Sequence, residues 1–272
     1  MASELSALLA ADPEVKLLDE TARAWCKDLT VCQRYLSCGE KNGVPGPMNA
    51  LPFLRSTAKW RDELRVGELL SSEEDCAFEV KLRQLLLYDL TSDRLGRPIM
   101  IERVGAWDMG ALREACEASP DEILRAHVMV SERIRLRVDG THRSDGASRG
   151  APMEREAVLI FDCEGMGWAH IRAVASLGGL FSRMSKIDAE HFPETVGHIF
   201  VVNTSRIFTA LWAAVSPFVA SGTKAKVHIF SWANAAAMSE ALREACGAEV
   251  VPAELGGMLT GAKPYTWPAT PA

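Results

Sequence analysis

The chain has 272 residues, of which 48% are apolar and 24% are charged. This balance is typical of a globular protein and excludes a chain that is disordered throughout. The net charge of −6 argues against a general nucleic-acid binder, which needs a positive field.

The seven cysteines include no C-x-x-C pair, and we expect them to be reduced thiols of a cytoplasmic protein. The first residues lack the basic and apolar regions of a secretory signal. No apolar run approaches the roughly 20 residues that a membrane-spanning helix needs, so any membrane contact should be peripheral and transient.

Residues 1–73 predict a small region built only from helices. One helix over 19–38 has four apolar positions at helical spacing: Trp25, Leu29, Cys32 and Leu36. A turn rich in Gly and Pro follows, and a second helix over 52–65 has another such stripe: Phe53, Leu54, Thr57 and Trp60.

Residues 74–157 predict a helix over 79–90, a polar turn over 91–98 and a short strand over 98–105. Two helical segments then follow, with a break near Ser119 and Pro120. The tract 139–155 is rich in Gly, Ser and Arg without periodic apolar residues, and is typical of a surface loop.

Residues 158–231 carry the clearest fold signal. Three apolar runs rich in β-branched residues, at 158–162, 198–203 and 227–231, are separated by segments of helix length. This pattern predicts βαβ crossovers and an α/β fold with a mostly parallel sheet. The segment 205–218 is apolar on nearly every side, which is typical of a core helix or of one that covers an apolar ligand. A helix ending at Gly247 completes the pattern.

Catalytic motifs such as G-x-S-x-G, H-E-x-x-H and the phosphate-binding loops do not occur. Cys163, at the end of a strand, is a candidate nucleophile with His170 or His191 as its base, although a buried, unreactive thiol is the more common case. The six histidines show no metal-like clustering. We therefore expect no metal site.

Several motifs in this chain resemble the CRAL-TRIO lipid-binding domain of the yeast-type phosphatidylinositol-transfer proteins. Their order and spacing match the family over most of the chain. They are Gly96–Pro98, Asp162–Gly165, His191–Glu194, Val201–Asn203, Ile207–Trp212, Ser216–Phe218, Thr223–Lys226 and Glu254–Gly257.

The resemblance implies a helical annex over 1–73 and a lipid-binding domain over 74–272. It also implies a monomer that carries or presents one lipid, such as phosphatidylinositol or phosphatidylcholine, without catalysis and without a cofactor. The lipid would lie between the sheet and a movable gate helix. Gate helix and pocket would be formed by Ile207, Phe208, Leu211, Trp212, Val215, Phe218, Ile99, Ile160 and Val201.

The resemblance further assigns the lipid headgroup to Glu194, Thr223 and Lys226. A lysine can donate to phosphate, and a glutamate can accept from hydroxyl groups. The family usually has two basic residues after its first annex helix, where this chain has Ser37–Glu40. A different lipid or an isoprenoid therefore stays open, with Arg34 and Lys41 as candidates to replace the missing cations.

Two other hypotheses stay open beside the carrier. One is a regulatory or protein-interaction module whose pocket is filled by its own side chains. The other is a hydrolase that uses Cys163. A basic series could in addition meet anionic lipids, or simply be a solvated loop: Arg133, Arg135, Arg137, His142, Arg143, Arg149 and Arg155.

Overall fold

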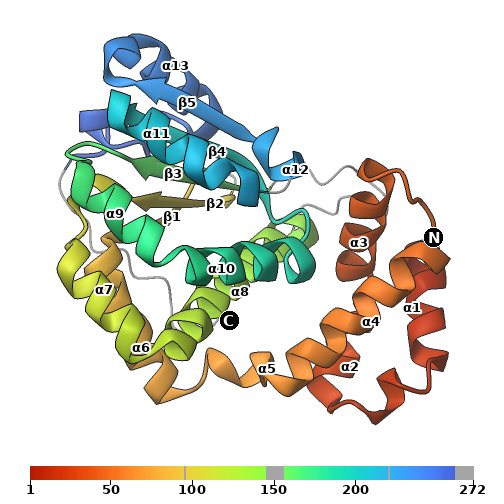
Figure 1. Ribbon diagram of the computed structural model, residues 1–272. Helices are drawn as coiled ribbons and strands as arrows, with labels where there is room; N and C mark the ends of the chain where they lie inside the picture. Colours follow the sequence, from red (N-terminus) through yellow and green to blue (C-terminus); the bar gives the residue numbers. More distant parts are fainter. Residues whose placement is uncertain (95, 145–155, 220, 261–272) are drawn as a thin grey trace.

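The computed structural model of the chain describes residues 1–94, 96–144, 156–219 and 221–260, without the side chains of 141–144, 174, 175, 214, 215 and 218. A five-stranded sheet lies at the centre of the larger part of the molecule (Figure 1). The strands are β1 (Tyr88–Ser92), β2 (Pro98–Glu102), β3 (Ala157–Asp162), β4 (Val196–Thr204) and β5 (Val227–Ser231).

The strands lie in the order of the sequence, and β2 to β5 run parallel to one another. Among the described strands, β1 alone is antiparallel to its neighbour, β2. The mostly parallel α/β sheet that the sequence predicts is therefore confirmed.

Helices connect the strands and cover both faces of the sheet. The longer ones in the larger part are α6 (Glu73–Leu86), α7 (Met109–Ala118), α8 (Pro120–Ser144), α9 (Trp168–Ser176), α10 (Gly178–His191), α11 (Arg206–Val215) and α13 (Ala235–Cys246). Among the described residues, no helix is long and apolar enough to cross a membrane.

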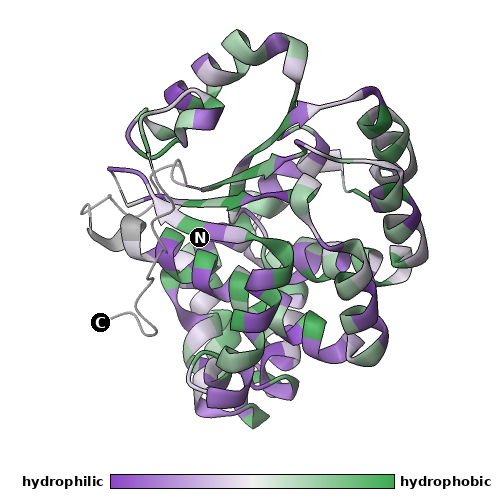
Figure 2. Ribbon diagram, turned by 90° about the vertical axis from the view of Figure 1, so that its left-hand side faces the viewer, coloured by the Kyte–Doolittle hydropathy of each residue, from purple (hydrophilic) through white to green (hydrophobic). Residues whose placement is uncertain are grey.

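The two faces of the sheet carry separate apolar clusters, because successive side chains of a strand point to opposite faces. On one face, α13 packs against Ile99, Ile101, Val158, Ile160, Phe200 and Val202. On the other face, α8 packs against Met100 and Leu159, while α11 packs against Phe161, Ile199 and Val201. Figure 2 shows the strands as the most continuous hydrophobic part of this region.

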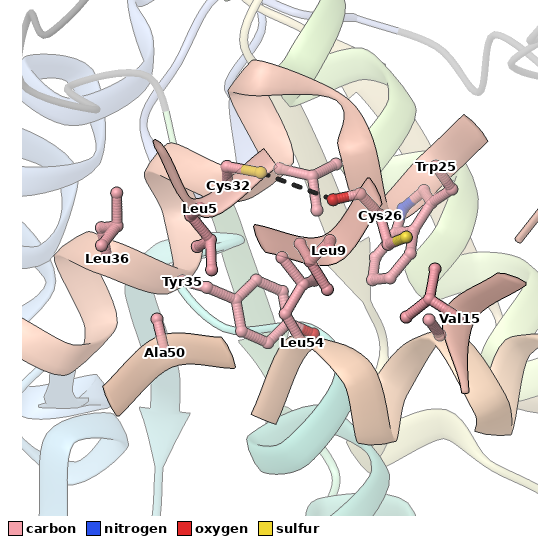
Figure 3. Packing of buried hydrophobic residues seen from close by; sticks show 12 residues of the cluster. Leu5, Leu9, Val15, Trp25, Cys26, Cys32, Tyr35, Leu36, Ala50 and Leu54 are labelled. Atoms are coloured by element: carbon pink, nitrogen blue, oxygen red, sulfur yellow. Dashed lines mark hydrogen bonds between the residues drawn. The ribbon is translucent and has the colours of Figure 1, made fainter. Parts of the chain in front are cut away.

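The annex is a group of helices beside the sheet: α1 (Ala2–Ala11), α2 (Glu20–Lys27), α3 (Leu29–Lys41) and α4 (Pro47–Glu63). Leu5, Leu9, Cys32 and Leu54 are among the fully buried residues of its core (Figure 3). A short helix, α5 (Val66–Leu69), leads from α4 towards the sheet domain and packs against α8.

Four expectations need correction. Residues 139–144 continue the helix α8 instead of beginning a surface loop, and the rest of that tract, 145–155, lies outside the described residues. The segment 19–38 is not one helix, because the Asp28 side chain accepts the Thr30 N–H at 2.8 Å and begins a new helix there. Phe53 lies on the outer side of α4 with 61% of its surface exposed. Residues 88–92 form the strand β1 rather than the end of a helix, after a left-handed turn at Leu87 (φ 48°).

A buried ionic network joins the annex to the sheet domain. Arg61 of α4 donates two hydrogen bonds to Glu132 of α8, at 2.9 and 2.7 Å. Arg135 donates to Glu132 and to Asp139, and Arg34 of α3 donates to Asp139 as well. Since each of these side chains is almost fully buried, the annex and α8 form one packed unit.

Candidate ligand-binding site

The helix α11 lies over the carboxyl half of the sheet. Phe208 and Leu211 are buried against Val201 and Cys163, and Trp212 stacks on Phe208 with 6.2 Å between ring centroids. The outer side of α11 carries small or polar residues, namely Arg206, Thr209, Ala210 and Ala213. The helix is therefore less apolar on its outer side than the sequence suggests.

The predicted pocket residues fall on two faces of the sheet. Phe208, Leu211, Trp212 and Val201 belong to the cluster under α11, and Ile207 is half-buried. The side chains of Val215 and Phe218 lie outside the described residues.

Ile99 and Ile160 pack against α13 instead, so the expectation that they share a pocket with α11 is corrected. Their neighbours along the strands, Met100, Leu159 and Phe161, point to the opposite face, which α8 and α11 cover. The physical reason is the two-residue period of a strand, in which a shift by one residue changes the face.

Four charged side chains meet at the amino edge of the parallel strands, and we call them the amino-edge cluster: Lys41, Glu156, Glu194 and Lys226. Glu156 directly precedes β3, Glu194 stands two residues before β4, and Lys226 directly precedes β5. Parallel strands bring their amino ends to one edge of the sheet. Lys41 reaches the same place from the last turn of α3.

Glu194 is the centre of this cluster. Its carboxylate accepts a hydrogen bond from Lys41 Nζ and lies 3.5 Å from Lys226 Nζ. Its backbone is left-handed (φ 52°), and its carbonyl accepts a hydrogen bond from Arg34. Lys226 Nζ also donates to the carbonyl of Val196 at 2.6 Å.

The two carboxyl groups of the cluster differ in pKa. Burial, together with hydrogen bonding to Glu194, raises the pKa of Glu156 to about 7 against the charges of Lys226 and Lys41. Burial acts the same way on Glu194, but hydrogen bonds from Lys41 and Glu156, with the charge of Lys226, hold its pKa below the usual value. When Glu156 carries a proton, two lysines face one carboxylate, and this positive balance favours an anionic ligand.

The other predicted headgroup residue, Thr223, lies in the short helix α12 (Ser221–Lys224). Its carbonyl accepts the backbone N–H of Lys226 at 3.0 Å, so it helps to fix the segment before β5. Glu156 is not predicted from the sequence, and Lys41 is predicted only as a candidate. Glu156 could have been found, because it directly precedes a strand of the parallel sheet.

Glu102 is a further polar group that sequence reasoning missed. It is 8% exposed and lies at the carboxyl end of β2, where it pairs with Phe161 and so points to the α11 face. Burial raises its pKa to about 8, although the charge of His127 acts in the opposite direction. Its carboxyl group has no hydrogen-bond partner in the described part of the chain. It is therefore a neutral carboxyl group inside the protein near neutral pH.

The arrangement that a cysteine nucleophile needs is not observed. Cys163 is buried, and burial raises the pKa of its thiol to about 12, which disfavours the reactive thiolate. His170 Nδ1 accepts the backbone N–H of Gly167 at 3.1 Å. His191 stacks on Trp60 at 3.9 Å and lies 3.1 Å from Thr57 Oγ1, at the contact with the annex.

The basic series does not form one exposed face. Arg135 is buried in the network with Glu132, and Arg133 forms an ion pair with Glu79 at 3.3 Å. The side chains of His142 and Arg143 and the residues Arg149 and Arg155 lie outside the described residues. In the described part of the chain, no group of three or more His, Cys, Asp or Glu side chains could hold a metal ion.

Comparison with known proteins gives consistent matches. The profile of the CRAL/TRIO domain matches residues 82–257. The phosphatidylinositol/phosphatidylcholine transfer protein SFH7 of Arabidopsis thaliana is 28% identical over 206 residues, which cover 74% of this chain and 35% of that protein. A CRAL-TRIO domain-containing protein of Caenorhabditis elegans is 28% identical over 236 residues, 82% of this chain and 31% of that protein.

The chain spans between 22% and 35% of the length of the first three curated relatives it matches. Among solved structures, that of Sfh5 superposes with a TM-score of 0.59 at 13% identity, covering 86% of this chain and 77% of the other. At this identity the similarity shows a shared fold.

Proposed function

Because the chain belongs to the CRAL/TRIO domain family, we propose that it binds one lipid molecule between the sheet and α11 and transfers or presents it without covalent chemistry. The observation that carries this proposal is the combination of an apolar cluster under a single helix with a charged cluster at one end of the same strands. Several relatives are named as phosphatidylinositol/phosphatidylcholine transfer proteins.

Such a protein needs an apolar interior because acyl chains are poorly soluble in water. Transfer of two acyl chains of about 16 carbons from water to an apolar site is favourable by some 25 kcal/mol, at roughly 0.8 kcal/mol per CH₂ group. A protein site of similar apolarity makes extraction from a bilayer nearly neutral. The motion of a covering helix can then set the rate.

α11 has the properties that such a cover requires. It contacts the sheet mainly through Phe208 and Leu211, which belong to the apolar cluster rather than to a hydrogen-bonded network. Apolar contacts carry no directional constraint, so acyl chains can replace them at little cost. Displacement of α11 would expose the face formed by Phe161, Ile199 and Val201.

The polar part of the ligand has two candidate positions. Glu194, Lys226 and Lys41 form the amino-edge cluster, which suits a phosphate group with neighbouring hydroxyls. Glu102 lies on the α11 face at the other end of β2, where a neutral carboxyl can donate to an ester or phosphate oxygen. We propose a phospholipid as the ligand class, carried by a cytoplasmic monomer that contacts membranes transiently.

Native mass spectrometry of the purified protein, followed by extraction and identification of the lipid, tests this function. One phospholipid per chain is the expected result, and exchange with labelled lipid in vesicles would follow. The tight contact of Phe208 and Leu211 with the sheet favours a second candidate, a regulatory module without exchangeable lipid. A chain that stays empty after incubation with mixed vesicles would support that candidate and exclude the carrier.

A further inference from the structure

Two tryptophans stand exposed at the edge of the sheet opposite to the amino-edge cluster. Trp168 begins α9, just after the turn that follows β3, and is 60% exposed. Trp232 directly follows β5 and is 70% exposed. Since β3, β4 and β5 are parallel, their carboxyl ends meet at one edge, which lies at the left of the sheet in Figure 1.

The surroundings of both tryptophans are mostly uncharged. Residues 232–237, with the sequence WANAAA, are all exposed and include no charged side chain. Ala169 next to Trp168 is exposed as well, as are Thr209 and Ala210 on the first turns of α11. Exposed aromatic side chains that stand among small uncharged residues are typical of an interaction surface.

The exposed charges at this edge have a positive balance. Arg172 follows Trp168 by one helical turn, and Arg206 begins α11 between the ends of β3 and β5. Both arginines are exposed and have no ion-pair or hydrogen-bond partner in the part of the chain that the structure describes. Glu164 is an exposed carboxylate of the same edge, and Arg103 at the end of β2 is paired with Glu254.

We propose that this carboxyl-edge surface, formed by Trp168, Arg172, Arg206 and Trp232, docks the protein on a bilayer that contains anionic lipid. Tryptophan prefers the interface of a membrane because its ring is apolar and its N–H is polar. Arginines near a negatively charged leaflet each add an attraction that salt screens. The first turn of α11 is part of this surface, so docking brings the bilayer to the cover of the proposed lipid site.

This inference rests on the proposed function, but the two can fail separately. The docking surface and the amino-edge cluster lie at opposite ends of the strands, so substitutions at one leave the contacts of the other in place. Native mass spectrometry reports the bound lipid, and flotation with vesicles reports docking. A chain that retains its lipid but does not float would leave the proposed function standing and overturn the docking surface.

The decisive experiment is flotation with vesicles of phosphatidylcholine alone and of phosphatidylcholine with phosphatidylserine. We expect the double variant Trp168→Ala and Trp232→Ala to lower the partition coefficient about tenfold on both. The double variant Arg172→Gln and Arg206→Gln should remove only the gain from phosphatidylserine. Phe53→Ala is the matched control, since Phe53 is an exposed aromatic residue on the annex, and it should float like the parent.

Quenching by brominated phosphatidylcholine gives a second measurement. The tryptophan fluorescence of the parent protein should fall on vesicle binding, and the variants Trp168→Phe and Trp232→Phe should each show a smaller fall. Equal flotation of the double tryptophan variant and the parent would overturn the proposal. So would light scattering that shows a dimer of the parent and a monomer of the tryptophan variant, because a second copy would then occupy the surface.

Discussion

Arg34 donates a hydrogen bond to the backbone carbonyl of Glu194, 160 residues further along the chain. The same guanidinium forms an ion pair with Asp139, and both side chains are buried. A left-handed backbone is costly for a residue other than glycine, so this contact helps to hold Glu194 in place. The annex thus contributes directly to the amino-edge cluster. Arg34 binds the backbone carbonyl of Glu194, and Lys41 binds its carboxylate.

The network behind Arg34 should be essential for stability. Burial would raise the pKa of Glu132, but the guanidinium groups of Arg135 and Arg61 hold it well below its usual range. Glu132→Gln leaves two buried arginines without their shared carboxylate, and we expect a loss of about 3–5 kcal/mol in the free energy of unfolding by urea. Glu117→Gln breaks an exposed pair with Arg113 and should change this free energy by less than about 0.5 kcal/mol. Equal effects would contradict the prediction.

We expect Lys41 to take the role of one of the two basic residues that the family usually has where this chain has Ser37–Glu40. Its side chain is 58% exposed, whereas that of Lys226 is 23% exposed. We therefore expect Lys41→Met to weaken the retention of an anionic phospholipid about fivefold and Lys226→Met about tenfold or more. Competition between labelled phosphatidylinositol and phosphatidylcholine measures both. Lys224→Met is the control, and a similar loss there would show that general charge, not the cluster, is responsible.

Much of the fold could be predicted from the sequence, because β3, β4 and β5 are short apolar runs separated by helices. β1 could not, since residues 88–92 follow α6 with no Gly or Pro between them, and the break is a leucine in a left-handed conformation. The contact of Lys41 with Glu194 joins residues 153 positions apart. Local sequence patterns carry no information about contacts between residues so far apart in the sequence. Strand alternation alone does not tell which face of the sheet α13 covers.

The division of the sheet into two faces can be tested with one residue from each. Ile160 is fully buried against α13, so Ile160→Ala should lower the free energy of unfolding by about 2–5 kcal/mol and leave the bound lipid unchanged. Val201→Phe adds volume under α11, and we expect less lipid per chain in native mass spectrometry, with a stability cost of about 1–3 kcal/mol. The assignment of faces would be wrong if Ile160→Ala emptied the protein while Val201→Phe stayed loaded.

Cys163 should be unreactive. Burial raises the pKa of its thiol to about 12, and burial with the charge of Glu194 also raises the pKa of Cys38, but Cys38 is only half-buried. Alkylation followed by mass spectrometry should label Cys38 faster than Cys163, because the Cys38 thiol is more accessible to the reagent. Cys163→Ala should leave lipid binding and transfer unchanged. Fast labelling of Cys163, with loss of a hydrolytic activity in the variant, would revive the hydrolase hypothesis.

His191 should make stability depend on pH at the contact between annex and sheet domain. Burial, followed by the charges of Arg61 and Lys186, lowers the pKa of His191 to about 4, from 6.5 in an unfolded chain. Between these two values His191 is protonated in the unfolded state and neutral in the folded state. Stability is therefore lost as the pH falls from about 6.5 to 4.

The loss should amount to a few kcal/mol, at about 1.4 kcal/mol per pH unit. His191→Phe keeps an aromatic ring against Trp60 and removes the titrating group, so its unfolding free energy should fall less steeply over this range. Glu156 and other carboxyl groups titrate nearby in both proteins, and the difference between the two curves isolates His191. Parallel curves for the two proteins would show that His191 is protonated in the folded state, contrary to its buried stack on Trp60.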